Sequence, residues 1–149
     1  MQDHSVIYAD FTIKRTMDAP AERVYQAFAD QAFKEKWFGG PVTSEHTMDF
    51  RVGGSELNRG TFHDGVVHTF KAAYYDIVPN KRIVYAYEMY LDDKRISVSL
   101  ATIELAATGN ATELTLHESG AFLDGFDKPE VREQGTQGLL NALEDAVKN

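Results

Sequence analysis

The sequence predicts an α+β fold in which an antiparallel β-sheet of about six to seven strands is wrapped around one long C-terminal helix. Through most of the chain, apolar and polar residues alternate with a period of two, which is typical of strands with one buried face. Short turns rich in Gly, Pro, Asn and Asp separate these segments, so consecutive strands should run antiparallel. After residue 127 the apolar spacing becomes that of a helix roughly 20 residues, or about 30 Å, long.

The N-terminal part of the chain is expected to hold one strand and two short helices. Residues 6–17 alternate as a strand does. Asp18 can cap a helix over residues 21–30, and Pro20 suits its first turn. A second short helix, over residues 32–37, should end at the Gly-Gly-Pro sequence that follows.

The middle of the chain predicts an antiparallel meander. A first strand alternates over residues 47–52 and stops at Gly53-Gly54. Turns are predicted at residues 64–65, 79–80, 92–94 and 109–110, and strands are predicted to end near residue 63 and to run over 66–78, 95–106 and 111–119.

The last segment predicts a helix from about Asp127, which can cap it, to Val147, with Pro129 in its first turn. This helix is the only predicted element long enough to cover the apolar face of the sheet. The side chains on its apolar face are Val131, Gly135, Gly138, Leu139, Ala142, Leu143 and Ala146.

Composition limits the classes of function. The length of 149 residues is close to the common size of one domain, so we expect a single domain over residues 1–149. A net charge of −8 repels phosphate backbones and anionic lipids, so neither nucleic acid nor a membrane is expected as a partner. The sequence has no cysteine, no signal-peptide pattern and no membrane-length apolar run, and we expect a cytoplasmic protein.

Five motifs in chain order resemble those of a known superfamily. They are DAPAERVY at 18–25, WFGGP at 37–41, DFRVGG at 49–54, DIVPNKRI at 76–83 and GAFLDG at 120–125. Together with the order of elements, they resemble the START-like (SRPBCC) helix-grip superfamily, in the branch related to the activator of Hsp90 ATPase. The resemblance implies a deep cavity between the curved sheet and the C-terminal helix, which relatives use for lipids, hormones or aromatic polyketides. It implies no single activity.

The hairpin at residues 92–94 predicts which side chains face that cavity. With a two-residue turn, Tyr87 lies opposite Val98 on an apolar face that should lie under the helix. A slip of one residue would exchange the two faces. The other expected pairs on the apolar face are Tyr85–Leu100 and Met89–Ile96, and the solvent face carries Glu88, Ser97 and Ser99.

A hydrophobic cavity would be lined by aromatic and aliphatic side chains of the sheet, the second short helix and the long helix. Gly135 and Gly138 support this interpretation, because a glycine inside a helix costs about 1 kcal/mol and here would leave room beneath the helix. Ordinary core packing is the alternative for each residue. The expected ligand-binding residues are Trp37, Phe50, Phe70, Tyr85, Tyr87, Met89, Val98, Leu100, Gly138 and Leu139.

No catalytic residue, metal or cofactor is expected. His63 and His68 flank Asp64 and resemble part of a zinc site, but exposed hairpin histidines explain them better. His117 is an alternative acid or base, if its strand places it beside the cavity. No nucleophile elbow or phosphate-binding loop occurs in the sequence.

The function predicted is non-catalytic binding of a small apolar or aromatic molecule. Two alternatives stay open: an enzyme of the cyclase or dehydratase kind using the same cavity, and an interaction domain that contacts and stimulates a chaperone. A perturbed ionisable group facing the cavity would favour the enzyme, and a large exposed apolar patch would favour the interaction domain. The sequence leaves open whether the chain forms a homodimer.

Overall fold

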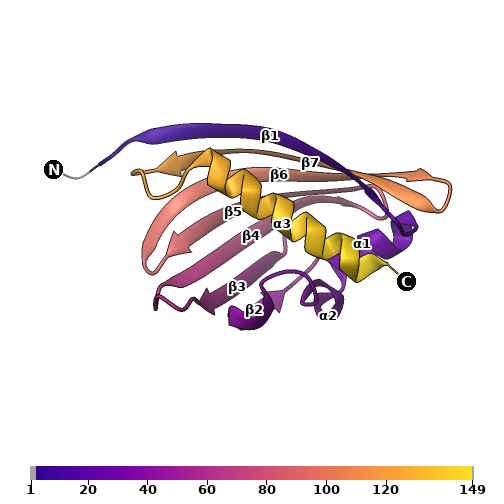
Figure 1. The fold of residues 1–149 in the computed structure, drawn as a ribbon, viewed down its shortest axis with the longest axis horizontal. Helices are drawn as coiled ribbons and strands as arrows, with labels where there is room; N and C mark the ends of the chain where they lie inside the picture. The colour runs from indigo at the N-terminus through magenta and orange to yellow at the C-terminus, as the bar shows by residue number, and fades with distance from the viewer. Residues whose placement is uncertain (1–2, 149) are drawn as a thin grey trace.

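A seven-stranded antiparallel sheet forms most of the protein in the computed structural model, which describes residues 3–148 (Figure 1). The strand order is β1-β7-β6-β5-β4-β3-β2, so the chain crosses from one edge of the sheet to the other and returns strand by strand. The strands are β1 (Val6–Met17), β2 (Thr43–Met48), β3 (Ser55–Thr61), β4 (Val67–Val78), β5 (Arg82–Leu91), β6 (Lys94–Thr108) and β7 (Ala111–Leu123).

Helices lie against one face of this curved sheet. The chain between β1 and β2 forms α1 (Ala21–Ala29), α2 (Gln31–Lys34) and a 3-10 turn, η1 (Gly40–Val42). The long helix α3 (Pro129–Val147) crosses the sheet, and its C-terminal end lies beside α1 (Figure 1). The predicted α+β fold, with a sheet wrapped around a C-terminal helix, is therefore confirmed. No helix within residues 3–148 is long and apolar enough to cross a bilayer.

Several predicted element boundaries are wrong. The predicted strand over residues 47–52 is in fact β2, which ends at Met48, and residues 49–54 form a loop. Gly53 takes a φ of 85° there, and its N–H bonds to the carbonyl of Tyr74 at 2.9 Å. Phe50 nevertheless packs into the core, edge-on to Tyr25 and Tyr74. The sequence alternation therefore continues past the end of the strand, although of its loop residues Phe50 is inserted and Val52 is 57% exposed.

The predicted helix caps differ as well. α1 begins after Pro20, whose carbonyl accepts the N–H groups of Arg23 and Val24, and no side chain caps it. Neither Asp18 nor Asp127 is an N-cap, because each lies one or two residues too early. The second short helix is α2, shorter than predicted and capped by the carboxylate of Asp30.

The buried face of α3 is rotated from the predicted one. Its buried side chains are Thr136, Leu140, Leu143 and Val147. Val131 is 55% exposed, and Gly135 and Gly138 are exposed too. Glycine and alanine bury little area, so an apolar face drawn through them does not fix the orientation of a helix. As a result, only the C-terminal half of α3 packs tightly on the core, together with α1.

Candidate functional site

A cavity of about 510 Å³ lies between the N-terminal half of α3 and the sheet. Phe70, Tyr85, Tyr87 and Met89 of β4 and β5 form its floor. Phe70 and Tyr87 lie 4.9 Å apart between ring centroids, and Tyr85 and Tyr87 lie 6.0 Å apart, so the floor is a continuous aromatic surface. The remaining apolar lining comes from Phe28, Trp37, Phe38, Val42, Phe62, Ile103, Leu116, Val131, Leu139 and Leu140.

There is room beneath the middle of α3 because the helix presents Gly135 and Thr136 to the cavity, whereas its C-terminal half packs Leu and Val on the core. A Cβ atom placed on Gly135, which lines the cavity, would meet no atom within 4 Å. Gly135 and Val131 are also exposed to solvent, so the cavity opens beside this part of the helix.

Six of the ten predicted ligand-binding residues line this cavity, and four do not. Phe50 lies in the core against Tyr25 and Tyr74. Gly138 lies on the exposed side of α3. Val98 and Leu100 are 44% and 48% exposed and lie on the outer face of the sheet. The six that line the cavity are Trp37, Phe70, Tyr85, Tyr87, Met89 and Leu139.

A β-bulge explains why Val98 and Leu100 were misplaced. Tyr87 pairs with Ser99, not with Val98, because the register shifts between Met89 and Tyr90. Ile96 is the extra residue of β6 at this shift, and a two-residue turn alone does not predict it. The observed pairs beside the cavity are Tyr85–Ala101, Tyr87–Ser99 and Met89–Ser97, and the predicted Tyr85–Leu100 and Met89–Ile96 pairs are wrong.

A buried polar cluster, formed by Glu118, Tyr87, Arg132 and Asp127, lines one end of the cavity. The Tyr87 hydroxyl donates to Oε2 of Glu118 at 2.7 Å and accepts from Nη1 of Arg132 at 3.1 Å. Nη2 of Arg132 donates to Asp127 at 3.1 Å and to Ser97 at 2.8 Å. The guanidinium lies 4.7 Å from the ring centroid of Phe122. We call this set the Glu118 cluster.

Burial raises the pKa of the Glu118 carboxyl, and Tyr87 and Arg132, which both favour the carboxylate, do not cancel that effect. Nη1 of Arg132 lies 3.7 Å from Oε2 of Glu118, whereas Nη2 lies only 3.1 Å from Oδ2 of Asp127, so the guanidinium pairs more closely with Asp127. Burial also raises the pKa of Tyr87, which therefore stays a neutral donor. Burial thus favours the neutral form of the Glu118 carboxyl over what a free carboxyl group would show.

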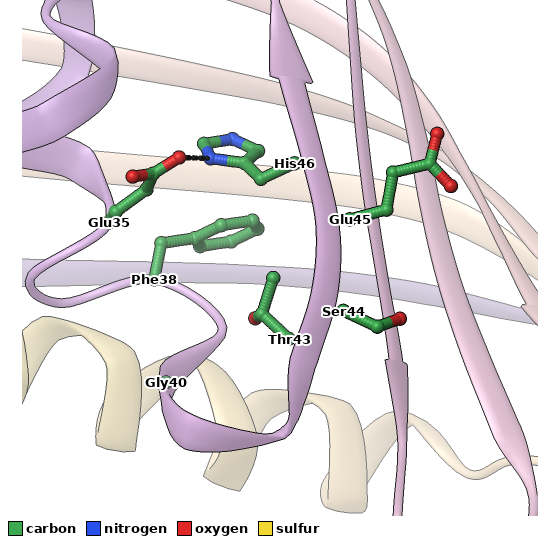
Figure 2. Close-up of a pocket in the computed structure, with 7 residues that line it drawn as sticks. All are labelled: Glu35, Phe38, Gly40, Thr43, Ser44, Glu45 and His46. Carbon is green, nitrogen blue, oxygen red and sulfur yellow. Dashed lines mark hydrogen bonds and ion pairs between the residues drawn. The ribbon is translucent and has the colours of Figure 1, made fainter.

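A second buried cluster joins α2 to the far edge of the sheet. Nζ of Lys34 lies 2.6 Å from Oε1 of Glu56, which also accepts the Tyr74 hydroxyl. His46 bonds to Oε2 of Glu56 at 2.8 Å and to Glu35 at 2.9 Å. Figure 2 shows the Glu35–His46 contact across the gap between the turn after α2 and β2, in a pocket of about 280 Å³. We call this set the Glu56 cluster.

In the Glu56 cluster the carboxylate is ionised, and both of its oxygens have hydrogen-bond partners. Burial alone would raise the pKa of Glu56, but the Lys34 ammonium and the bonds from His46, Lys34 and Tyr74 overcome it and hold the pKa at about 2. The bond to Glu56 raises the pKa of His46 despite burial, and Glu35 adds to this effect. Lys34 reaches the cavity wall, where its ammonium lies 4.6 Å from the ring centroid of Phe38.

We expect the stability of the protein to fall as pH rises above neutrality because of His46. A histidine whose pKa is raised on folding stabilises the fold fully below its unfolded pKa of about 6.5, and this contribution disappears as pH rises through the folded pKa. Urea unfolding between pH 6 and 9 measures it. A His46→Gln variant should lose this slope, and a variant with the wild-type slope would contradict the assignment.

A polar group at the cavity wall has no partner within residues 3–148. Nδ2 of Asn58, on β3, is buried without a hydrogen bond. Buried polar groups are rarely left unpaired, so Asn58 can bind a ligand atom or water. Tyr85 also lines the cavity, and burial raises its pKa well above the ordinary value, so its hydroxyl stays neutral.

The histidines do not form the sites considered from the sequence. His117 lies on the outer face of β7, 3.1 Å from Asp10, so it does not reach the cavity. His63 is exposed, and His68 stacks on Phe62 at the cavity wall with ring centroids 3.9 Å apart. In the part of the chain that is described, no three His, Cys, Asp or Glu side chains are placed to hold a metal ion.

Comparison with known families agrees with this architecture. A family model described as "Activator of Hsp90 ATPase homolog 1-like protein" matches residues 18–148. The chain belongs to this family. The resemblance found in the five sequence motifs is therefore confirmed. The matched range, residues 18–148, includes the residues of both polar clusters and of the cavity. A search of curated proteins finds no match to this chain.

Solved structures similar to this family member share its fold over nearly the whole chain. A protein of Rhizobium leguminosarum is 39% identical with a TM-score of 0.93, covering 97% of each chain. One of Rhizobium loti is 44% identical with a TM-score of 0.91, covering 96% of this chain and 99% of that one. A third, of Chromobacterium violaceum, is 29% identical with a TM-score of 0.77, covering 95% and 99%.

The sequence prediction missed the polar residues of the site. Glu118 had a usable signal, because it continues the buried alternation of Leu114 and Leu116 on β7. Arg132 and Lys34 lie on helix faces where a solvated charge is the normal expectation. The polar residues at the cavity that were not predicted are Lys34, Asn58, Glu118, Asp127, Arg132 and Thr136.

Proposed function

We propose that this protein binds a small hydrophobic or aromatic molecule in the cavity between α3 and the sheet. The observation that carries the proposal is the cavity itself: about 510 Å³, lined mainly by aromatic and aliphatic side chains, with a few polar groups gathered on its walls. Ligand sites of drug-sized molecules typically have this volume, roughly 300–1,000 Å³, and this kind of lining.

The geometry of the floor supports an aromatic ligand. Phe70, Tyr85 and Tyr87 present a surface of neighbouring rings on which a flat molecule can stack. These rings are held by the central strands of the sheet, so little ordering is needed on binding. Since the chain has no cysteine, we propose that binding takes place in the reducing cytoplasm.

Binding can be measured with N-phenyl-1-naphthylamine, an uncharged probe whose emission rises in apolar sites. Trp37 is the only tryptophan and lines the cavity, so bound probe should quench its emission saturably at one molecule per chain. Native mass spectrometry of freshly purified protein should also detect a co-purified molecule. A probe titration with no saturable quenching of Trp37 would contradict the proposal.

Glu118 favours a second candidate function, an acid–base enzyme of the cyclase or dehydratase kind. The feature is a carboxyl group at the cavity wall whose pKa is raised by burial. A co-purified molecule, once extracted, should then be converted by the wild-type protein and left unchanged by a Glu118→Gln variant. Binding without conversion by the wild type would leave ligand binding as the function.

A further inference from the structure

Within the Glu118 cluster, hydrogen bonds lead from Arg132 through the Tyr87 hydroxyl to Glu118. Asp127 and Ser97 hold the guanidinium of Arg132, Arg132 donates to Tyr87, and Tyr87 donates to Oε2 of Glu118. The bond from Tyr87 occupies Oε2 of Glu118. The Glu118 carboxyl also lines the cavity, so a bound molecule can reach it there.

The two cationic side chains at the cavity, Arg132 and Lys34, already have carboxylate partners other than Glu118. Arg132 of α3 is paired with Asp127, and the other charged group at the cavity, Lys34, is paired with Glu56. The groups that face Glu118 from β5 are the neutral Tyr85 and Tyr87, β6 contributes the hydroxyl of Ser99, and the cross-strand neighbour on β1 is Phe11. An ionised Glu118 would be a surplus negative charge.

A ligand that displaces water from the cavity makes this surplus charge more costly. Burial disfavours the charged form of a carboxyl group, so the occupied cavity should hold Glu118 as the neutral acid. A neutral carboxylic acid has one O–H donor, and Tyr87 already occupies the Oε2 side. The donor is therefore on Oε1, and because Glu118 lines the cavity, a ligand oxygen can compete with the Ser99 hydroxyl for it.

We propose that Glu118, as the neutral acid, donates a hydrogen bond to a carbonyl oxygen of the bound molecule. The ligand class is then an uncharged, mainly aromatic ketone, aldehyde or ester, and anionic ligands are disfavoured. This inference rests on the proposed function, because it names the ligand of the same cavity. Asn58 and Tyr85 are further donors for a second oxygen, but neither of them changes charge between pH 5 and 9.

A matched pair of compounds isolates the carbonyl oxygen. 2-Acetylnaphthalene and 2-isopropenylnaphthalene have nearly the same shape and differ in C=O against C=CH₂. Their affinities are measured by displacement of N-phenyl-1-naphthylamine between pH 5.5 and 8.5. At the acid end the acetyl compound should bind roughly tenfold more tightly, as one good hydrogen bond allows. Its advantage should shrink as rising pH ionises Glu118.

Two variants assign the effect to Glu118. In Glu118→Gln the amide oxygen can accept from Tyr87 and the NH₂ group takes the donor position, so the preference for the acetyl compound should persist and become independent of pH. In Glu118→Leu the preference should disappear. Glu113→Gln, on the exposed face of the same strand, is the matched control and should behave as wild type.

Failure of this inference differs from failure of the proposed function. If the probe binds but the wild type does not distinguish the two compounds, or if Glu118→Gln keeps the pH dependence, the inference is wrong and binding stands. A preference that grows with pH would also overturn it, because an ionised Glu118 has no donor to offer a carbonyl oxygen. If the probe does not bind at all, both proposals fail. Should Glu118→Leu not fold, the pH profile of Glu118→Gln decides.

Discussion

Replacing Gly135 by Leu is expected to weaken binding in the cavity by about tenfold or more and to leave the fold at least as stable as before. Gly135 lines the cavity, and a Cβ atom there meets nothing within 4 Å, so a leucine side chain would occupy the space of the ligand. Removing a glycine from a helix interior should itself stabilise the helix by about 0.8 kcal/mol. Probe titration and urea unfolding measure the two effects separately.

Gly138 supplies the matched control for this prediction. It lies on the same helix with equally open surroundings, but on the exposed side and away from the cavity. Gly138→Leu should therefore bind the probe as the wild type does. Equal loss of binding in both variants would mean that the effect is indirect. Strong destabilisation by Gly135→Leu would mean that the space beneath the helix is not available to a ligand.

The two glycines show that a sequence pattern can predict a helix without predicting which way its faces turn. Helical spacing placed both Gly135 and Gly138 on the apolar face of the last helix, and Gly138 was the expected cavity residue. In the structure Leu140, Leu143 and Val147 set the orientation, which turns Gly138 to solvent. Periodicity predicts that a helix has an apolar side, while its orientation depends on which large side chains find space in the core.

The sheet was predictable for a different reason. Its turns carry residues that favour a positive φ, as at Asn80, Asp92, Gly65 and Gly109, and such turns fix where antiparallel strands begin and end. The bulge at Ile96 was not predictable, because it depends on how β6 fits between β5 and β7 and leaves no local signal. That one extra residue moved Val98 and Leu100 from the expected cavity to the outer face.

The apolar part of the site follows from alternation, and the polar part does not. Tyr85 and Tyr87 belong to a strand whose apolar side is evident in the sequence. Lys34 and Glu56 come from a four-residue helix and from a short strand with few apolar residues, and only the folded chain brings them 2.6 Å apart. Lys34 and Glu56 are 22 residues apart in the sequence, so no local sequence pattern predicts that they form an ion pair.

Removing the charge of Glu56 is expected to destabilise the fold by about 3–5 kcal/mol, because it leaves the Lys34 ammonium buried without a counter-charge. The Glu56→Gln variant keeps the shape of the side chain and isolates the charge. A pKa that falls from 4.5 to about 2 on folding corresponds to about 3 kcal/mol at neutral pH, which agrees in magnitude. Urea unfolding at pH 7 measures the loss.

The pH dependence gives this prediction its sign. A carboxyl group whose pKa is lowered on folding stabilises the protein above its unfolded pKa of 4.5, and this contribution disappears as pH falls toward about 2. Wild type should therefore lose the Glu56 contribution in acid, and Glu56→Gln, which lacks it throughout, should show a correspondingly smaller acid slope. The two proteins should approach the same stability near pH 2.

A double variant separates the unpaired charge from the lost contacts. Lys34→Met in the Glu56→Gln background removes the buried ammonium, so stability should recover in part, as it does when both members of a buried pair become neutral. Glu45→Gln is the control, since Glu45 belongs to an exposed pair with Arg59 and should change stability by less than about 0.5 kcal/mol. If Glu56→Gln costs no more than Glu45→Gln, the Glu56 cluster does not hold α2 against the sheet. If Lys34→Met restores nothing, the loss comes from the hydrogen bonds of Tyr74 and His46 instead of the charge.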